Sequence, residues 1–98
     1  NNIGEVKRAM GDYDGAIEMY QKANTIYINV LGTDHTLTAT SYNNIGLVKE
    51  AMGDYEGALE MFQKALAILV KVLGADHPLT VRSDSNIEFV KNAMRNDR

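Results

Sequence analysis

The stretch "NNIGLVKEAMGDYEGALEMFQKAL", residues 43–66, decides the fold, because the chain contains it twice. The other copy is "NNIGEVKRAMGDYDGAIEMYQKAN", residues 1–24, so that Asn1 returns as Asn43 and every later pair keeps the same offset. When the two copies are aligned over one full period, 15 of the 42 positions differ and 27 are identical. A third copy begins at Ser85, and six of its positions up to Arg98 match the second. The chain is therefore a repeat protein, in which each repeat is stabilised by contacts with its neighbours.

Each repeat is predicted to contain two helices. In the first half of the full period that begins at Thr36, apolar residues recur at steps of three and four, which is the spacing of one helix face: Tyr42, Ile45, Val48 and Met52. Gly53 then ends this helix through a positive φ, and Asp54 caps the next one. A second apolar stripe follows, with the same spacing. The predicted helices lie near residues 1–10, 13–30, 36–52, 55–72 and 78–96, with no strand.

The motif Leu-Gly-x-Asp-His occurs at residues 31–35 and 73–77, where one helix must stop and the next must start. We interpret Gly74 as a C-terminal cap, and Asp76 or His77 as an acceptor for unpaired backbone N–H groups of the following helix. The alternative is a metal site. Zinc needs about four ligands at roughly 2 Å, whereas the two Asp-His pairs lie one repeat apart and packed helices are about 8–10 Å apart. We therefore expect no metal and no cofactor.

The bulk composition excludes several other classes of function. The net charge is −3 and the ten basic residues are scattered, which argues against a nucleic-acid partner. No apolar run approaches the length of roughly 18 residues that a membrane-spanning helix needs, so no membrane span is predicted. The absence of cysteine excludes disulfides and fits an intracellular, cytoplasmic protein. The chain also starts without Met, which indicates a piece of a longer protein, or a processed or engineered one.

The sequence also argues against an enzyme. It has no nucleophile–base set such as Ser-His-Asp, no glycine-rich phosphate loop and no cysteine, and both histidines fall in predicted loops. We expect no catalytic residue.

The repeat resembles the tetratricopeptide repeat (TPR), in the long form found in kinesin light chains. The residues that carry the resemblance are small and aromatic ones at fixed offsets within the second copy: Gly46, Gly53, Tyr55, Ala58, Phe62 and Ala65. It implies an all-α fold, a right-handed superhelical stack of antiparallel helix pairs. On this basis residues 1–98 form one repeat domain. Its parts are a truncated first repeat (1–35), a second repeat (36–77) and a capping helix (78–96).

The capping helix is predicted from two departures of the third copy, one of which replaces Gly53-Asp54-Tyr55 by Arg95-Asn96-Asp97. Glu88 stands in the third copy where Gly46 stands in the second, and a glutamate is a poor residue for a close helix–helix contact. The outer side of this helix is therefore expected to face water.

The resemblance implies a concave groove lined by the first helix of each repeat, which binds a peptide or a partner helix. The residues expected to line it share one helical phase: Asn2, Glu5, Arg8, Thr40, Asn43, Asn44, Leu47, Glu50, Arg82, Ser85, Asn86 and Phe89. Asn2, Asn44 and Asn86 recur in all three copies, and in the related families asparagines in this slot hold a peptide backbone. The alternative is that each Asn bonds to a neighbouring helix. Leu47 and Phe89 are expected to form an apolar pocket, and Arg8 and Arg82 to meet an acidic group.

A second interpretation is structural rather than ligand-binding. Because the first repeat is truncated, its second helix is expected to leave Ile26, Tyr27 and Val30 under-covered. An exposed apolar surface of this kind favours association. The alternative function is therefore a self-associating module, a homodimer or an end-to-end stack, without a dedicated peptide ligand.

Overall fold

The computed structural model describes residues 13–96, which form four α-helices and contain no strand. In chain order they are α2 (Tyr13–Leu31), α3 (Thr36–Ala51), α4 (Tyr55–Leu73) and α5 (Pro78–Asn96). All four agree with the predicted helices to within one residue at each end. The fifth predicted helix, 1–10, lies outside the described residues. The all-α repeat architecture is confirmed.

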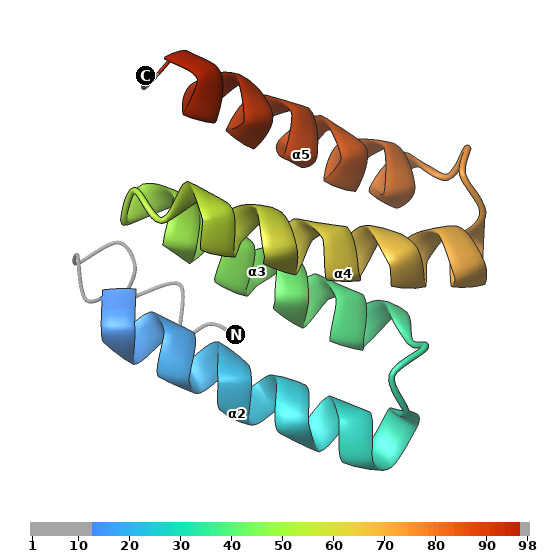
Figure 1. Cartoon of the computed structure of the whole chain (residues 1–98). Coiled ribbons are helices and arrows are strands. Elements are labelled where there is room, and N and C mark those ends of the chain that lie inside the picture. Colours follow the sequence, from blue (N-terminus) through green and yellow to red (C-terminus); the bar gives the residue numbers. More distant parts are fainter. Residues whose placement is uncertain (1–12, 97–98) are drawn as a thin grey trace.

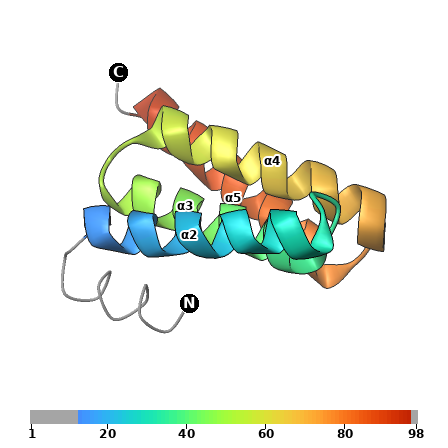
Figure 2. The ribbon, with the colours of Figure 1, turned by 90° about the horizontal axis from the view of Figure 1, so that it is seen from below.

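The helices pack as antiparallel neighbours in a single row of contacts. α3 contacts both α2 and α4, and α4 in turn contacts α5 (Figure 1; Figure 2, from below). α3 is therefore packed between two helices, whereas the main packing partner of α5 within residues 13–96 is α4.

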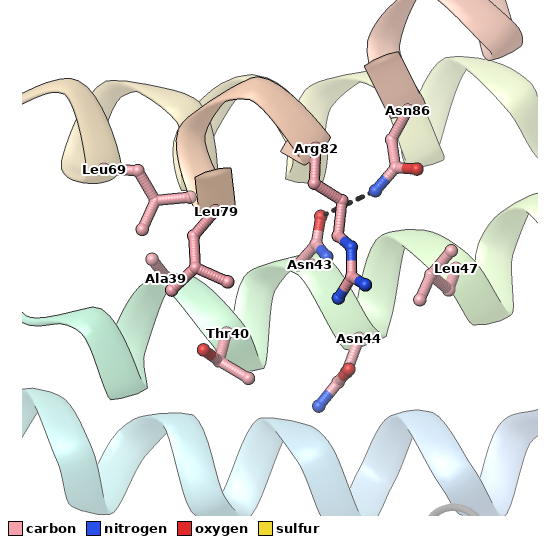
Figure 3. A pocket seen from close by; sticks show the side chains of 9 residues that line it. All are labelled: Ala39, Thr40, Asn43, Asn44, Leu47, Leu69, Leu79, Arg82 and Asn86. Carbon is pink, nitrogen blue, oxygen red and sulfur yellow. Dashed lines mark hydrogen bonds between the residues drawn. The ribbon is translucent and has the colours of Figure 1, made fainter. Parts of the chain in front are cut away.

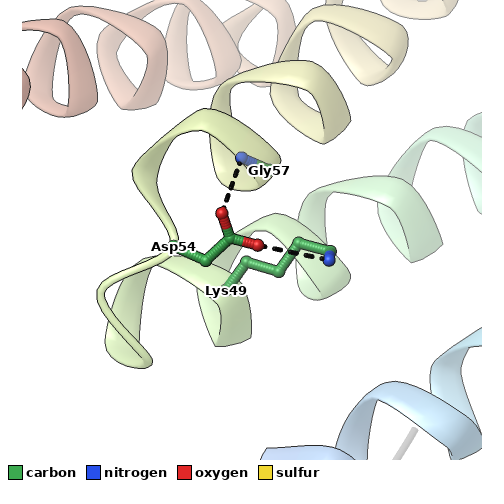
Figure 4. A network of polar contacts seen from close by, with 3 residues as sticks. All are labelled: Lys49, Asp54 and Gly57. Atoms are coloured by element: carbon green, nitrogen blue, oxygen red, sulfur yellow. Dashed lines mark hydrogen bonds and ion pairs between the residues drawn. The ribbon is translucent and has the colours of Figure 1, made fainter.

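Each turn between helices uses the residues that the sequence predicts. Gly32, Gly53 and Gly74 have φ angles of 89°, 85° and 90°, and each follows a helix end. An L-residue with a side chain rarely adopts this conformation, so glycine is the residue that stops each helix there. Asp54 is the N-cap of α4, and its side chain accepts a hydrogen bond from the backbone N–H of Gly57 at 3.0 Å. The same carboxylate pairs with the ammonium of Lys49 at 3.5 Å, which ties the end of α3 to the start of α4 (Figure 4).

The core is divided among the helix contacts. One cluster joins α2 to α3 through Ala16, Tyr20, Ile45 and Val48. A second joins α3 to α4 through Ala39, Ala65, Ile68 and Leu69, and a third joins α4 to α5 through Ala58, Phe62, Ile87 and Val90. Ile87 and Val90 stand one period after Ile45 and Val48. Equivalent residues of successive repeats therefore fill equivalent helix–helix contacts.

Gly46 shows why a small residue is needed between α3 and α4. A Cβ atom built on it would lie 2.6 Å from Cε1 of Phe62, closer than two carbon atoms can approach. Any side chain here would push α4 away from α3 or displace the Phe62 ring. This confirms the role that the sequence assigns to Gly46.

Candidate functional site

The two Leu-Gly-x-Asp-His loops act as helix caps in this structure. The Nδ1 atom of His35 accepts a hydrogen bond from the backbone N–H of Leu37 at 3.1 Å, and His77 does the same for Leu79 at 3.1 Å. The histidine, rather than the aspartate, is therefore the capping acceptor. The aspartate of the first loop has a different role, because Asp34 pairs with Lys71 of α4 at 2.6 Å. Within residues 13–96, no group of three or more metal-ligating side chains comes together.

A pocket of about 340 Å³ lies between α3 and α5, on the face that the sequence predicts to form a groove. Six of the predicted groove residues line it: Thr40, Asn43, Asn44, Leu47, Arg82 and Asn86. Ala39, Leu69 and Leu79 complete the wall (Figure 3). The pocket combines an apolar wall with several hydrogen-bonding groups and one cation, which is typical of a site that fixes a ligand in one orientation.

A hydrogen bond between two asparagine side chains bridges the pocket. Asn86 Nδ2 on α5 donates to Asn43 Oδ1 on α3 at 3.3 Å (Figure 3). This is the hydrogen bond to a neighbouring helix that the alternative interpretation expects. On α3 it uses Asn43, the first asparagine of the pair, whereas Asn86 corresponds by the repeat period to the second, Asn44. Asn44 lines the same pocket, and its amide points away from the Asn43–Asn86 pair. Asn2, the remaining member of the predicted ladder, lies outside the described residues, as do Glu5 and Arg8.

Arg82 supplies the positive charge of the pocket. Its side chain extends from α5 past Asn43 toward Asn44, and none of the ion pairs within residues 13–96 involves it (Figure 3). An exposed guanidinium without a carboxylate partner keeps its five donors available to a ligand.

The apolar part of the pocket wall does not include Phe89. Phe89 is 61% exposed, and the expected pairing of Leu47 with Phe89 stays a prediction. Leu47 shares the wall with Leu69 and Leu79. Leu79 lies three and seven residues before Arg82 and Asn86, and Phe89 lies seven and three residues after them, so the two residues share one face of α5 and differ in their position along it. That spacing is visible in the sequence.

Two further residues of the predicted groove lie outside the pocket wall. Ser85 is exposed and Glu50 is half-buried, and neither contributes to the wall. Burial raises the pKa of the Glu50 carboxyl above its usual value. Thr40 does line the pocket, and its hydroxyl donates to the carbonyl of Thr36 at 2.9 Å.

The residues proposed for self-association lie on α2. Ile26 is 60% exposed and Val30 is 74% exposed, whereas Tyr27 is half-buried. Their counterparts on α4 differ in burial, because Ile68 and Leu69 pack against Ala39 of α3. No helix within residues 13–96 is long and apolar enough to cross a membrane.

Comparison with known families agrees with the geometry. A family model described as the tetratricopeptide repeat matches residues 1–69 and again residues 42–87, which together span most of the chain. The two overlapping matches are offset by about one repeat. A search of curated proteins finds no match.

Proposed function

Because the chain belongs to the tetratricopeptide repeat family, we propose that it binds an extended peptide, or a helix, of a partner protein in the pocket between α3 and α5. Tetratricopeptide repeats are generally protein–protein interaction modules and are typically non-catalytic. The observation that carries the proposal is the set of three asparagines around an apolar wall, together with an arginine that has no ion-pair partner within residues 13–96.

The Asn43–Asn86 pair is suited to a peptide backbone. Its hydrogen bond uses the acceptor of Asn43 and one donor hydrogen of Asn86. The amide hydrogens of Asn43 and the carbonyl oxygen of Asn86 are left for a ligand. A peptide group presents one N–H and one C=O, so it matches this pair whatever its side chains are. Each such bond contributes about 0.5–1.5 kcal/mol net.

Side-chain preference in the proposed ligand comes from the other residues of the pocket. Arg82 favours a carboxylate, because a guanidinium forms two parallel hydrogen bonds with it. Leu47 and Leu79 favour an apolar side chain beside that carboxylate. We therefore expect the ligand to carry an acidic and an apolar residue close together.

The subtype and the division of the domain remain part of this proposal. The usual tetratricopeptide repeat has about 34 residues. The period of this chain, which separates Asn1 from Asn43, is longer and supports the kinesin-light-chain-like form. The exposed Glu88 on α5 supports the interpretation of residues 78–96 as a capping helix of a single domain, 1–98, after repeats at 1–35 and 36–77.

The experiment is a peptide-library selection against the full chain, followed by titration of the selected peptide. Asn44→Ala should weaken binding about threefold to tenfold through lost hydrogen bonds, with little change in thermal stability. Ser85→Ala is the matched control, because Ser85 lies on the same helix as Asn86 but outside the pocket. Equal affinities of wild type and Asn44→Ala, with stability lost instead, would make the asparagine structural.

The second candidate function is self-association through α2, and the high exposure of Ile26 and Val30 favours it. Exposed apolar side chains that lie together on one surface mark contact sites. Light scattering over a range of protein concentrations separates the two functions. A mass that rises with concentration in wild type and falls back in Val30→Lys would support self-association, whereas a constant monomer mass would exclude it.

A further inference from the structure

His77 is joined to the wall of the peptide pocket by a hydrogen bond to the backbone. Its Nδ1 atom accepts from the N–H of Leu79 at 3.1 Å, and the side chain of Leu79 lines the pocket together with Leu69 and Ala39 (Figure 3). Leu79 is 42% exposed, so packing holds it less firmly than it holds a buried leucine. The direction of this side chain therefore depends on the backbone of the first turn of α5, which the His77 cap fixes.

The backbone around His77 holds its ring at the start of α5. The N–H of His77 donates to the carbonyl of Gly74 at 3.4 Å, and its own carbonyl accepts from the N–H of Val81 at 3.0 Å. Pro78, the first residue of α5, has no N–H. Leu79 therefore presents the first backbone donor of the helix, and the ring of His77 is the acceptor for it.

This acceptor exists only while the imidazole is neutral. A neutral ring with its hydrogen on Nε2 has a lone pair on Nδ1, whereas a protonated ring carries hydrogens on both nitrogens. In the protonated form the Nδ1–H group faces the N–H of Leu79, and a positive charge lies at the positive end of the helix dipole. Histidine changes its charge between about pH 5 and 8. The cap is thus present at neutral pH and is lost as the pH falls.

The charged groups of the adjoining elements are carboxylates, a lysine and an arginine. In the loop, in the last turn of α4 and in the first two turns of α5 they are Asp76, Lys71 with its partner Asp34, Arg82 and Asp84. Groups of these three kinds ordinarily titrate outside the range of about pH 5.5 to 7.5. A change at the start of α5 over this range is therefore assigned to the imidazole.

His35 provides a comparison within the same chain. It caps α3 in the same way, because its Nδ1 atom accepts from the N–H of Leu37 at 3.1 Å. Leu37, however, is not among the residues that line the pocket. Protonation of His35 should therefore weaken the start of α3 without releasing a leucine of the pocket wall.

We propose that His77 is a positioning residue of the peptide pocket, which holds Leu79 in the wall as a neutral imidazole and releases it in mild acid. The inference rests on the proposed function, because it concerns the same pocket. It adds that ligand binding weakens as the pH falls from about 7.5 to about 5.5, and that this pH dependence comes from His77. The part of the ligand affected is the apolar side chain that packs on Leu79.

The test begins with the full chain and no ligand. In NMR spectra recorded over about pH 5.5 to 7.5, the backbone amide signal of Leu79 should shift in parallel with the imidazole nitrogen signals of His77. In His77→Asn the Leu79 amide signal should stay in place, because asparagine caps a helix without titrating. A Leu79 amide that does not follow His77 in wild type, or that titrates equally in His77→Asn, overturns the positioning role.

The second arm titrates the selected peptide at about pH 7.5 and about pH 5.5. Wild type should lose about threefold in affinity on acidification, whereas His77→Asn should bind equally well at both values. His77→Ala, which has no cap, should bind about threefold more weakly than wild type at the higher pH and show no further loss at the lower one. His35→Asn is the matched control, because it replaces the equivalent cap of α3, and it should lose affinity as wild type does.

The proposed function and the role of His77 fail in different ways. If Asn44→Ala leaves the affinity unchanged, the pocket is not the binding site, and the ligand-free spectra decide whether His77 positions Leu79. If Asn44→Ala weakens binding and the pH dependence persists in His77→Asn, the pocket stands and the role of His77 is overturned. A pH dependence that disappears in His35→Asn instead of in His77→Asn overturns it as well.

Discussion

α3 and α5 occupy the same phase of the repeat, yet their surroundings differ. α3 lies between α2 and α4, whereas α5 contacts α4. On the side toward the preceding helix the two agree, since Ile45 and Val48 recur as the buried Ile87 and Val90. On the opposite side Ala39 and Gly46 become Val81 and Glu88, which are exposed. Within residues 13–96, the two helices therefore keep the same residues on the side where both have a neighbour and differ on the side where α3 alone is covered.

The buried hydroxyls sharpen this comparison. On α3, Ser41 donates to the carbonyl of Tyr20 at 3.0 Å and Thr38 donates to Gly32. On α5, the equivalent hydroxyls of Ser83 and Thr80 are buried and have no partner within residues 13–96. The same residue types therefore stabilise the packing of α3 and destabilise that of α5.

The largest expected difference is at the close-contact position. Gly46→Leu should destabilise the fold by about 1–3 kcal/mol, because its side chain must displace the ring of Phe62. Glu88→Leu should change stability by no more than about 0.5 kcal/mol, because that position is exposed. Urea unfolding of the two variants measures both effects. Equal costs would show that α5 is as enclosed as α3.

The next effect concerns the paired serines. Ser41→Ala should cost about 1 kcal/mol, since it removes a buried hydrogen bond and leaves the Tyr20 carbonyl without that donor. Ser83→Ala should be neutral or stabilising by up to about 1 kcal/mol, because the hydroxyl it removes is buried without a partner in the described part of the chain. Thermal unfolding of both variants gives the sign directly. A destabilised Ser83→Ala would mean that this hydroxyl is bonded in solution.

The capping histidines should behave alike, because the two loops have the same geometry. His35→Ala and His77→Ala should each lower stability by about 0.5–1 kcal/mol, the usual cost of a lost cap. Calorimetry with and without zinc tests the same residues for metal binding. A zinc-dependent rise in melting temperature that disappears in His77→Ala would contradict the capping role.

The smallest effect is at Glu50, which corresponds to the neutral Asn92 of α5. Because burial raises the pKa of Glu50 in the folded state, its ionisation disfavours folding. Stability should therefore fall as the pH rises from the usual pKa of the carboxyl through the raised one. Glu50→Gln should raise the melting temperature at pH 7 by no more than about 2 °C and leave it unchanged near pH 3. A larger gain in melting temperature at pH 3 than at pH 7 would contradict the prediction that ionisation of Glu50 disfavours folding.

The sequence predicts the helix bounds well, because the repeat period, the apolar stripes and the glycines in the turns all indicate the same boundaries. Gly53 and Asp54 mark a boundary that the structure reproduces. The residues of the groove are harder to predict, because the side chains that share one helical phase cover a larger surface than a single pocket does. Phase alone finds Arg82 and Asn86, but it does not distinguish Leu79, which lines the pocket, from Phe89, which does not.

The partner of Asn86 is a second feature that the repeat does not predict. Repeat offset relates Asn86 to Asn44, whereas its hydrogen bond goes to Asn43. Two helices of the same phase can lie staggered by one residue where they face each other, and the sequence period does not contain that stagger. The choice between a peptide-binding and a cross-helix asparagine therefore needed the packing of α3 against its neighbours.

The most direct test of the groove is to follow the asparagine side-chain amides by NMR during titration with the selected peptide. We predict that the NH₂ resonances of Asn43, Asn44 and Asn86 shift and saturate together, while that of the exposed Asn29 on α2 stays unchanged. If the peptide binds and the three amides remain unperturbed, the ligand lies elsewhere and the groove is not the binding site.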